Sequence, residues 1–245
     1  MMHKESKMRG PYGFETNDNC QSCKLRAGAF FCQFSAPAVE DFSSIKSTAT
    51  YPAGALLFLE KQESRGVFVL CAGEVKLSIS SSAGKTLILR IAKAGEILGL
   101  MATMSGTAYE VTAETLHPCQ VAFLRRDDFL HFVTKHPEVY QNVVKQLSSL
   151  YSGACDQLRT VGLSASAPEK LARLLLSWTA DVKNTSAGAT IKLPLTHEDI
   201  AEFIGTTRET VTRTLSEFKS QHLVELEGST LMISNRSGLE TIGCA

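Results

Sequence analysis

Three cysteines near the amino terminus are the residues of this sequence best suited to carry chemistry. Cys20, Cys23 and Cys32 follow the pattern Cys-x2-Cys-x8-Cys in a polar segment without a sustained hydrophobic period. Thiolates are soft ligands that favour iron–sulfur clusters or zinc. The sequence therefore predicts a metal or redox site on an N-terminal arm formed by residues 1–35.

The start of the chain also indicates the compartment in which these thiols work. It lacks the apolar core of a secretory signal, and no apolar run approaches the ~18 residues that a membrane span requires. We therefore expect a cytoplasmic protein without a membrane anchor. Because the cytoplasm keeps thiols reduced, seven cysteines in such a chain point to metal or redox chemistry rather than to a disulfide framework.

A second informative segment lies near the carboxyl terminus, in the run LTHEDIAEFIGTTRETVTRTLSEFKSQHLVELEGSTLMIS, residues 195–234. Thr196 can cap a first helix. Ala201 allows two helices to cross closely, Gly205 accepts a left-handed turn, and Val211 fills the angle between the helices. Together these spacings predict a helix-turn-helix.

The second helix of this motif, expected over residues 207–221, carries side chains that can read DNA. The polar residues of its amino-terminal half, the part that enters the major groove, are Thr207, Arg208, Glu209, Thr212 and Arg213. Arginine can donate two hydrogen bonds to guanine O6 and N7, and glutamate can accept one from cytosine N4. The alternative is that these charges form only ion pairs on the helix surface, such as Arg213 with Glu217. Inside a helix-turn-helix we favour base reading.

The wing and the charge balance of the C-terminal domain indicate how tightly this domain binds DNA. Apolar residues at 223–226 and 231–233 flank a Glu-Gly-Ser turn and predict a β-hairpin wing. From Pro168 onward the chain has eight Lys and Arg residues against ten Asp and Glu, and the whole chain has 25 of each class. A domain without excess positive charge binds nonspecific DNA weakly, so useful affinity requires a dimer that reads two half-sites.

The middle of the chain must position both sites. With 44% apolar and 20% charged residues, the composition is that of an ordinary globular protein. From Ala49 to Leu124, short apolar runs separated by glycines predict a small antiparallel barrel or jelly roll. Alternation predicts one hairpin whose inward face is formed by Val75, Leu77, Ile79, Leu87, Leu89 and Ile91.

A long helix is expected to follow the barrel. Asp127 or Asp128 can cap a short helix, and Pro137 suits the first turn of a long one. A narrow apolar stripe runs along it, formed by Val139, Val143, Leu147, Leu150, Ala154, Leu158 and Val161. A stripe of this kind favours packing on another helix, so we predict homodimerisation, with packing on its own barrel as the alternative. The stretch at 165–168 is a candidate hinge.

This order of elements, ending in RETVTRTLSEFKSQHLV, resembles the cyclic-AMP receptor/fumarate-nitrate reductase regulator (CRP/FNR) family over about residues 45–235. The resemblance implies an α+β fold with a cyclic-nucleotide-binding-like β-barrel (jelly roll), a long dimerisation helix and a C-terminal winged helix-turn-helix. It implies a transcription regulator, not an enzyme, whose homodimer binds palindromic DNA with TGA-containing half-sites and acts on RNA polymerase. The expected parts are the arm (1–35), barrel sensor (36–126), dimerisation helix (127–165) and DNA-binding domain (166–245).

The barrel does not carry the residues that hold cyclic AMP in this family. The turn that contains Glu96 is present, but no lysine or arginine occurs between Lys93 and Arg125. Tyr109 and Glu110 occupy roughly the place of the family's arginine-serine pair, and a carboxylate there repels phosphate. Cyclic AMP is therefore not the expected effector.

The cysteines instead resemble those of the oxygen-sensing FNR branch, in which a barrel cysteine joins three N-terminal ones to hold a [4Fe-4S] cluster. The resemblance implies Cys20, Cys23, Cys32 and Cys119 as ligands, and oxygen or nitric oxide as the signal, with weaker DNA binding when the cluster is lost. Cys119 can alternatively be a packed thiol.

Three alternatives to the cluster stay open. These are zinc, a thiol–disulfide switch, and a small organic effector in the barrel. A thiol oxidoreductase is disfavoured because the Cys-x2-Cys pair does not open a helix after a strand. Cys71, Cys155 and Cys244 are interpreted as structural or incidental, and His117 and His197 as surface and helix-cap residues rather than ligands.

Overall fold

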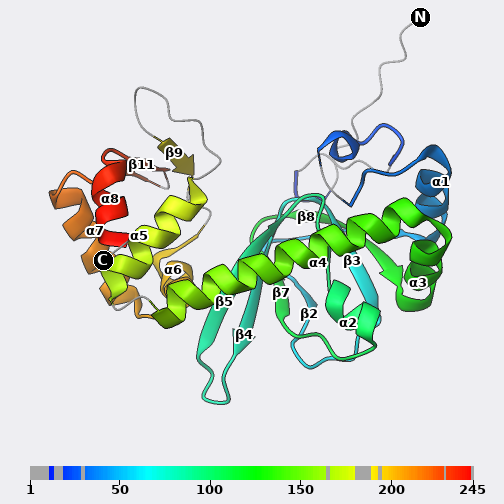
Figure 1. Cartoon of the computed structure of the whole chain (residues 1–245), viewed down its shortest axis with the longest axis horizontal. Helices are drawn as coiled ribbons and strands as arrows, with labels where there is room; N and C mark the ends of the chain where they lie inside the picture. Colours follow the sequence, from blue (N-terminus) through cyan, green and yellow to red (C-terminus); the bar gives the residue numbers. More distant parts are fainter. Residues whose placement is uncertain are drawn as a thin grey trace, which may run out of the picture. The chain divides into compact units, whose positions relative to one another are not determined.

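The protein is described by a computed structural model (Figure 1). The structure describes residues 11–13, 19–28, 31–163, 166–179, 189–192, 195–228 and 230–243. The chain divides into two compact units, one formed by residues 1–79 and 90–152 and the other by residues 80–89 and 153–245. Within the described ranges, no helix is both long and apolar enough to cross a membrane.

A jelly-roll barrel of two four-stranded antiparallel sheets, most of it in the first unit, is formed as the sequence predicts. The strand order is β1-β8-β3-β6 in one sheet and β2-β7-β4-β5 in the other. The strands are β1 (Ser47–Tyr51), β2 (Leu56–Phe58), β3 (Gly66–Ala72), β4 (Glu74–Ser80), β5 (Thr86–Lys93), β6 (Ile97–Leu98), β7 (Thr112–Thr115) and β8 (Cys119–Arg125). The fold class expected from the family resemblance is confirmed.

Two clusters of buried residues hold this unit together. The barrel core lies between the sheets and includes Phe58, Leu70, Val75, Tyr109, Cys119 and Val121. The helix-side core lies on the other face of the β1-β8-β3-β6 sheet and includes Phe31, Phe34, Phe42, Val67, Val69, Ala122, Leu124, Phe129 and Phe132. Helices α1 (Ala36–Ile45) and α3 (Arg126–Lys135) contact each other, and α3 packs on β3 and β8 (Figure 1), whereas the short α2 (Leu100–Ser105) follows β6.

The end of the N-terminal arm is part of the helix-side core, which its polar composition did not predict. The side chain of Phe31 is fully buried, and that of Phe34 is 8% exposed. The two rings meet edge to face with centroids 4.9 Å apart, and Phe34 also contacts Phe132. Burying one such side chain contributes about 1.5–3 kcal/mol. The arm is therefore anchored to the first unit just beside Cys32.

The predicted inward face of the first hairpin is correct on one strand and wrong on the other. On β4, Val75 and Leu77 are buried. On β5, the buried residues are Ile88 and Ala92, whereas the predicted Leu87, Leu89 and Ile91 are only half-buried. β5 is apolar on both faces, so alternation does not decide which face turns inward, and the pairing register decides it.

The long helix α4 spans Pro137–Leu158, begins at Pro137 as predicted, and continues into a π-helical turn, Arg159–Leu163. The predicted apolar stripe needs correction at its start, because Val139 and Val143 are buried in the helix-side core of the same chain. The exposed large apolar residues of α4 are Tyr140, Val144, Tyr151 and Leu158. The sequence therefore placed the start of the exposed stripe on the wrong side of the helix. The N-cap of α3 is also Arg125 rather than Asp127 or Asp128.

The second unit contains the predicted helix-turn-helix and wing. Its elements are α5 (Ala167–Trp178), β9 (Ala189–Lys192), α6 (His197–Ile204), α7 (Arg208–Ser220), β10 (Val224–Glu227), β11 (Thr230–Ile233) and α8 (Arg236–Gly243). The three strands form one sheet in the order β10-β11-β9. The wing hairpin β10–β11 is confirmed, whereas β9 was not predicted because its partner β11 lies far away in the sequence.

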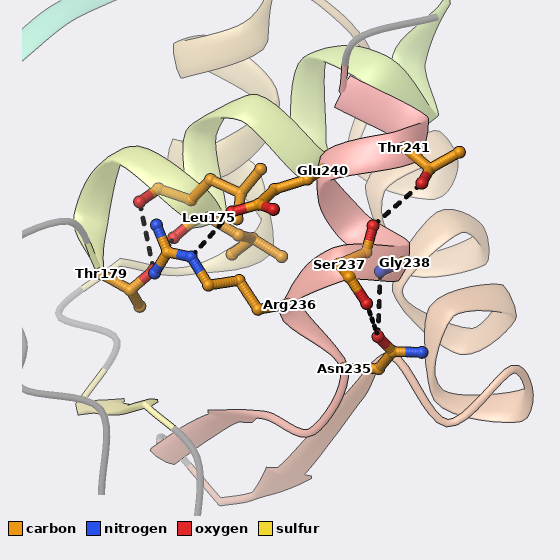
Figure 2. Close-up of polar contacts among 9 residues, drawn as sticks. Leu175, Thr179, Asn235, Arg236, Ser237, Gly238, Glu240 and Thr241 are labelled. Atoms are coloured by element: carbon orange, nitrogen blue, oxygen red, sulfur yellow. Dashed lines mark hydrogen bonds and ion pairs between the residues drawn. The ribbon is translucent and has the colours of Figure 1, made fainter.

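Local hydrogen bonds fix both ends of this unit. The Ser166 hydroxyl accepts from the Glu169 backbone N–H at 3.3 Å and caps α5 next to the predicted hinge. At the start of α8, Asn235 Oδ1 accepts from the Gly238 N–H at 2.9 Å, and Arg236 pairs with Glu240 at 2.9 Å (Figure 2). These caps satisfy helix-terminal donors that would otherwise lack partners.

Candidate functional site

The helix-turn-helix has the cap and turn that its sequence predicts. The Thr196 hydroxyl accepts from the Asp199 backbone N–H at 3.1 Å, and the Asp199 carboxylate accepts from the Thr196 backbone N–H at 3.0 Å. This is a complete capping box in which aspartate replaces the usual Glu or Gln. Gly205 ends α6 with φ 66° and ψ 45°, the left-handed conformation that glycine adopts without strain. The two helices are thus set in place by local residues.

The contact between α6 and α7 is formed by the small and β-branched residues of the motif. Ala201 and Val211 are buried, with 1% and 0% of their surfaces exposed. Trp178 of α5 meets Phe203 of α6 edge to face, with ring centroids 5.8 Å apart. The interior of this unit therefore fixes the orientation of α7.

All of the predicted base-reading residues lie on the exposed side of α7 or at its start, namely Thr207, Arg208, Glu209, Thr212 and Arg213. The Thr207 hydroxyl caps the helix by accepting from the Thr210 backbone N–H at 3.3 Å. Hydrogen bonds from its own backbone N–H and from Thr207 lower the pKa of Glu209, so its carboxylate stays charged and able to accept from a base. Among these described residues, neither arginine forms an ion pair with Glu209 or Glu217.

His197 contributes a contact that sequence reasoning missed. Its Nδ1 lies 2.9 Å from the Thr212 hydroxyl, which itself donates to the Arg208 carbonyl at 3.0 Å. Since the hydroxyl proton is used by that carbonyl, Thr212 accepts from His197. The first helix thereby positions the middle of the base-reading surface.

The N-terminal thiols form a second candidate site, located where the arm meets the barrel. Cys20, Cys23 and Cys32 are half-buried. The ammonium group of Lys46 lies 3.2 Å from Cys20 Sγ. Arg26 braces the loop between the cysteines by donating to the Gln21 carbonyl at 3.0 Å and to the Phe34 carbonyl at 3.2 Å.

A fourth thiol, which the sequence did not assign to this site, joins the arm cysteines. Burial raises the pKa of Cys32 to about 12, with further contributions from Cys71, Cys23 and Cys20. Burial likewise raises the pKa of Cys71 to about 11; Lys46 opposes this increase, and Cys20 and Cys23 add to it. Cys20, Cys32 and Cys71 also pack against the same helix-side core, so their thiols lie on one side of the sheet. Within the described ranges, no group of three or more His, Cys, Asp or Glu side chains is close enough to hold a single metal ion.

The structure does not bring Cys119 to this site. Its side chain is fully buried in the barrel core, and its thiol lies 3.1 Å from the His117 carbonyl and 3.3 Å from that of Glu74. Burial raises the pKa of this thiol, and no other cysteine contributes to the shift. In the conformation described, Cys119 is a packed thiol.

The residues that the sequence compares with the family's phosphate contacts have partners within the barrel. Tyr109 is 2% exposed, stacks on Phe58 with ring centroids 4.1 Å apart, and donates from its hydroxyl to the Gly66 carbonyl at 2.7 Å. Glu96 pairs with Arg90 and accepts from the Lys93 backbone N–H. Tyr109 and Glu96 thus each have polar partners within the first unit.

A jelly-roll barrel, a long helix and a winged helix-turn-helix follow one another along the chain. Residues 48–136 match the cyclic nucleotide-binding domain, and residues 169–242 match the Crp-like helix-turn-helix domain. The chain belongs to the CRP/FNR family of transcription regulators, which implies DNA binding by homodimers.

Three proteins illustrate this relationship. The transcriptional activatory protein AadR of Rhodopseudomonas palustris is 27% identical, covering 82% of this chain and 83% of its own. The nitrogen fixation regulation protein FixK of Bradyrhizobium diazoefficiens is 23% identical, covering 92% and 94%. The solved structure of FixK2 from Bradyrhizobium japonicum is 22% identical, covers 82% of this chain and 98% of its own, and has a TM-score of 0.71. That structural likeness supports the fold.

Proposed function

We propose that this regulator senses oxygen or nitric oxide through a [4Fe-4S] cluster bound by its N-terminal arm, and that the cluster controls binding of the homodimer to DNA. The observation that carries the proposal is the attachment of the arm to α4. Asn142 Nδ2 donates to the Gln33 carbonyl at 3.2 Å, and the Ser35 hydroxyl donates to the Glu138 carboxylate at 2.6 Å. The residues directly after Cys32 are therefore bonded to the predicted dimerisation helix.

The chemistry of this region fits an iron–sulfur cluster. Three thiols lie on one short arm, and Cys20 borders an open surface recess that small oxidants can enter. Lys46 supplies a positive charge next to the sulfurs, which offsets the negative charge that thiolate ligands bring. When bound, a [4Fe-4S] cluster supplies a redox-active group that reacts with oxygen and nitric oxide.

The chain's own residues provide the coupling to DNA binding. With the arm thiols held together, Gln33 and Ser35 keep their contacts with α4 and fix that helix for pairing with a second copy. Release of the thiols frees the arm and weakens both contacts. The exposed Tyr140, Val144 and Tyr151 of α4 offer the apolar surface for that pairing. DNA binding should therefore weaken when the arm is released.

On DNA, Arg208, Glu209 and Arg213 read palindromic sites with TGA-containing half-sites, and the bound dimer acts on RNA polymerase. The exposure of these residues at the start of α7 supports this assignment. Cyclic AMP is not the proposed effector, because the buried Tyr109 fills the barrel and the neighbouring Glu110 places a carboxylate near the expected phosphate position.

The test is a measurement on protein purified without oxygen. We expect a brown protein that contains iron and sulfide and binds a TGA-containing palindrome, and that loses both colour and tight binding after exposure to air. Cys155→Ala is the matched control, because this half-buried thiol belongs to the second unit and should leave the colour unchanged. A colourless, iron-free protein would contradict the cluster and favour zinc, a thiol switch or a small effector, while leaving DNA binding intact.

A further inference from the structure

We propose that Cys71, rather than Cys119, is the fourth thiol of the sensor site, so that Cys20, Cys23, Cys32 and Cys71 together form the ligand set. This inference rests on the proposed function for the identity of the bound group. It does not depend on that function for the grouping of the four thiols, which follows from the fold of the first unit.

The faces of two paired strands separate Cys71 from Cys119. β3 and β8 are antiparallel neighbours in which Leu70 pairs with Val121 and Ala72 with Gln120. Along β3, Val67 and Val69 belong to the helix-side core and Leu70 to the barrel core, so Cys71 falls on the helix side and packs against that cluster. The N-terminal arm also packs on this side of the sheet.

β8 presents its residues the opposite way. Cys119 and Val121 lie in the barrel core, whereas Ala122 and Leu124 lie in the helix-side core. Successive side chains of a strand point to opposite faces, so Cys119 could reach the arm only if the start of β8 shifted by one residue. Such a shift would also turn Val121 out of the barrel core.

Close packing keeps Cys119 where it is. A Cβ atom placed on Gly73 would lie 2.5 Å from Cys119 Sγ, so the sulfur already occupies the space that this glycine leaves open. Its contacts with the Glu74 and His117 carbonyls satisfy the thiol within the barrel. Cys119 is thus accounted for as a structural residue.

Cys71, in contrast, lies at a position suited to a functional side chain. It is the extra residue of a β-bulge, because Leu70 and Ala72 have partners on β8 at consecutive positions and Cys71 has none. A bulge re-aims a side chain locally and is often found next to functional sites. The thiol is half-buried, donates to the Val69 carbonyl at 3.7 Å, and packs against the same helix-side core as Cys20 and Cys32.

Lys46 is associated with three of the four thiols. Its ammonium group contacts Cys20 directly, and its charge acts on both Cys32 and Cys71. It immediately precedes β1, the edge strand that pairs with β8, so the sheet itself holds this cation in place. The positive charge of one lysine therefore acts on thiols from both the arm and β3, as expected for a single ligand set.

The first experiment compares Cys71→Ala with Cys119→Ala in protein purified without oxygen, measuring iron, sulfide and the visible spectrum per chain. We expect Cys71→Ala to lose most of its iron and colour, as Cys23→Ala does, and Cys119→Ala to retain both. Circular dichroism and thermal unfolding show whether each variant is folded, and Cys155→Ala is the control for removing a thiol elsewhere. The inference would be overturned if folded Cys71→Ala protein kept its iron while folded Cys119→Ala protein lost it.

A second experiment tests the grouping even if the wild-type protein binds no iron. Diamide accepts the two electrons and two protons that disulfide formation releases, and peptide mass mapping identifies the cysteines that it joins. We expect Cys71 to be joined to an arm cysteine and Cys119 to stay reduced. A disulfide between Cys119 and an arm cysteine, without one to Cys71, would refute the grouping. Absence of iron together with the expected disulfide would reject only the cluster.

Discussion

The two functional regions of this protein are built in different ways. The predicted DNA-binding surface consists of one helix and its caps, and all of the residues proposed to read bases lie in one seven-residue segment, from Thr207 to Arg213. The thiol site combines an arm with the strand β3, and its members lie up to 51 positions apart, from Cys20 to Cys71. A surface set by local geometry can be inferred from spacing, whereas a site assembled across the fold depends on which face of a strand turns toward it.

The largest expected effect tests the anchoring of the arm. Phe31→Ala should lower the free energy of unfolding of the sensor unit by about 3–5 kcal/mol, because it removes a fully buried ring from the helix-side core. Near-ultraviolet circular dichroism from the five tyrosines, all in the first unit, follows this transition. Fluorescence of Trp178, the single tryptophan, reports the second unit and should change little. An equal fall in the free energy of unfolding by both signals would show that Phe31 does not stabilise the first unit in particular.

The next effect concerns base reading. Arg213→Ala should weaken binding to a TGA-containing palindrome by about 1–3 kcal/mol per half-site and reduce discrimination against a substituted base pair. Lys219→Ala, which removes an exposed charge from the end of the same helix, is the control and should affect all DNA sequences alike. Competition binding on matched and substituted sites separates the two. Undiminished discrimination in Arg213→Ala would remove this arginine from the base-reading set.

A smaller effect is expected at the cap of the helix-turn-helix. Thr196→Ala removes the hydroxyl that accepts from the Asp199 N–H and should cost about 0.5–2 kcal/mol of stability. Trp178 fluorescence during denaturation should detect the loss, while the iron content stays at the wild-type level. Thr196→Ser keeps the hydroxyl and should restore most of the stability; its failure to do so would exclude the cap as the cause.

The smallest expected effect is a pH dependence confined to the sensor unit. A hydrogen bond from Lys135, then one from His136, lowers the pKa of Asp41 below its ordinary value of 3.8. Because the folded-state pKa is depressed, Asp41 contributes stability above pH 3.8, and that contribution is lost as the pH falls through the lower folded value. The melting temperature of Asp41→Asn should thus differ less from wild type below this range than above it. Parallel pH profiles for the two proteins would refute this account.

The sequence predicted most of the fold because most of its signals are local. The glycine-punctuated strands gave the barrel, Pro137 gave the start of α4, and Thr196, Gly205 and Val211 gave the helix-turn-helix. It missed β9 and chose the wrong face of β5, because long-range pairing decides both. It also assigned Val139 and Val143 to a dimer surface, although the helix-side core of the same chain buries them.

By itself, then, the sequence determined the helix-turn-helix and its exposed second helix, because the caps, the turn and the exposed residues of α7 follow from neighbours a few positions away. It also identified the arm cysteines as a group from their spacing. Only the tertiary structure decided which barrel cysteine lies beside them. That choice depends on opposite faces of two paired strands, β3 and β8, and one residue of register separates a thiol that faces the arm from one that faces the barrel core.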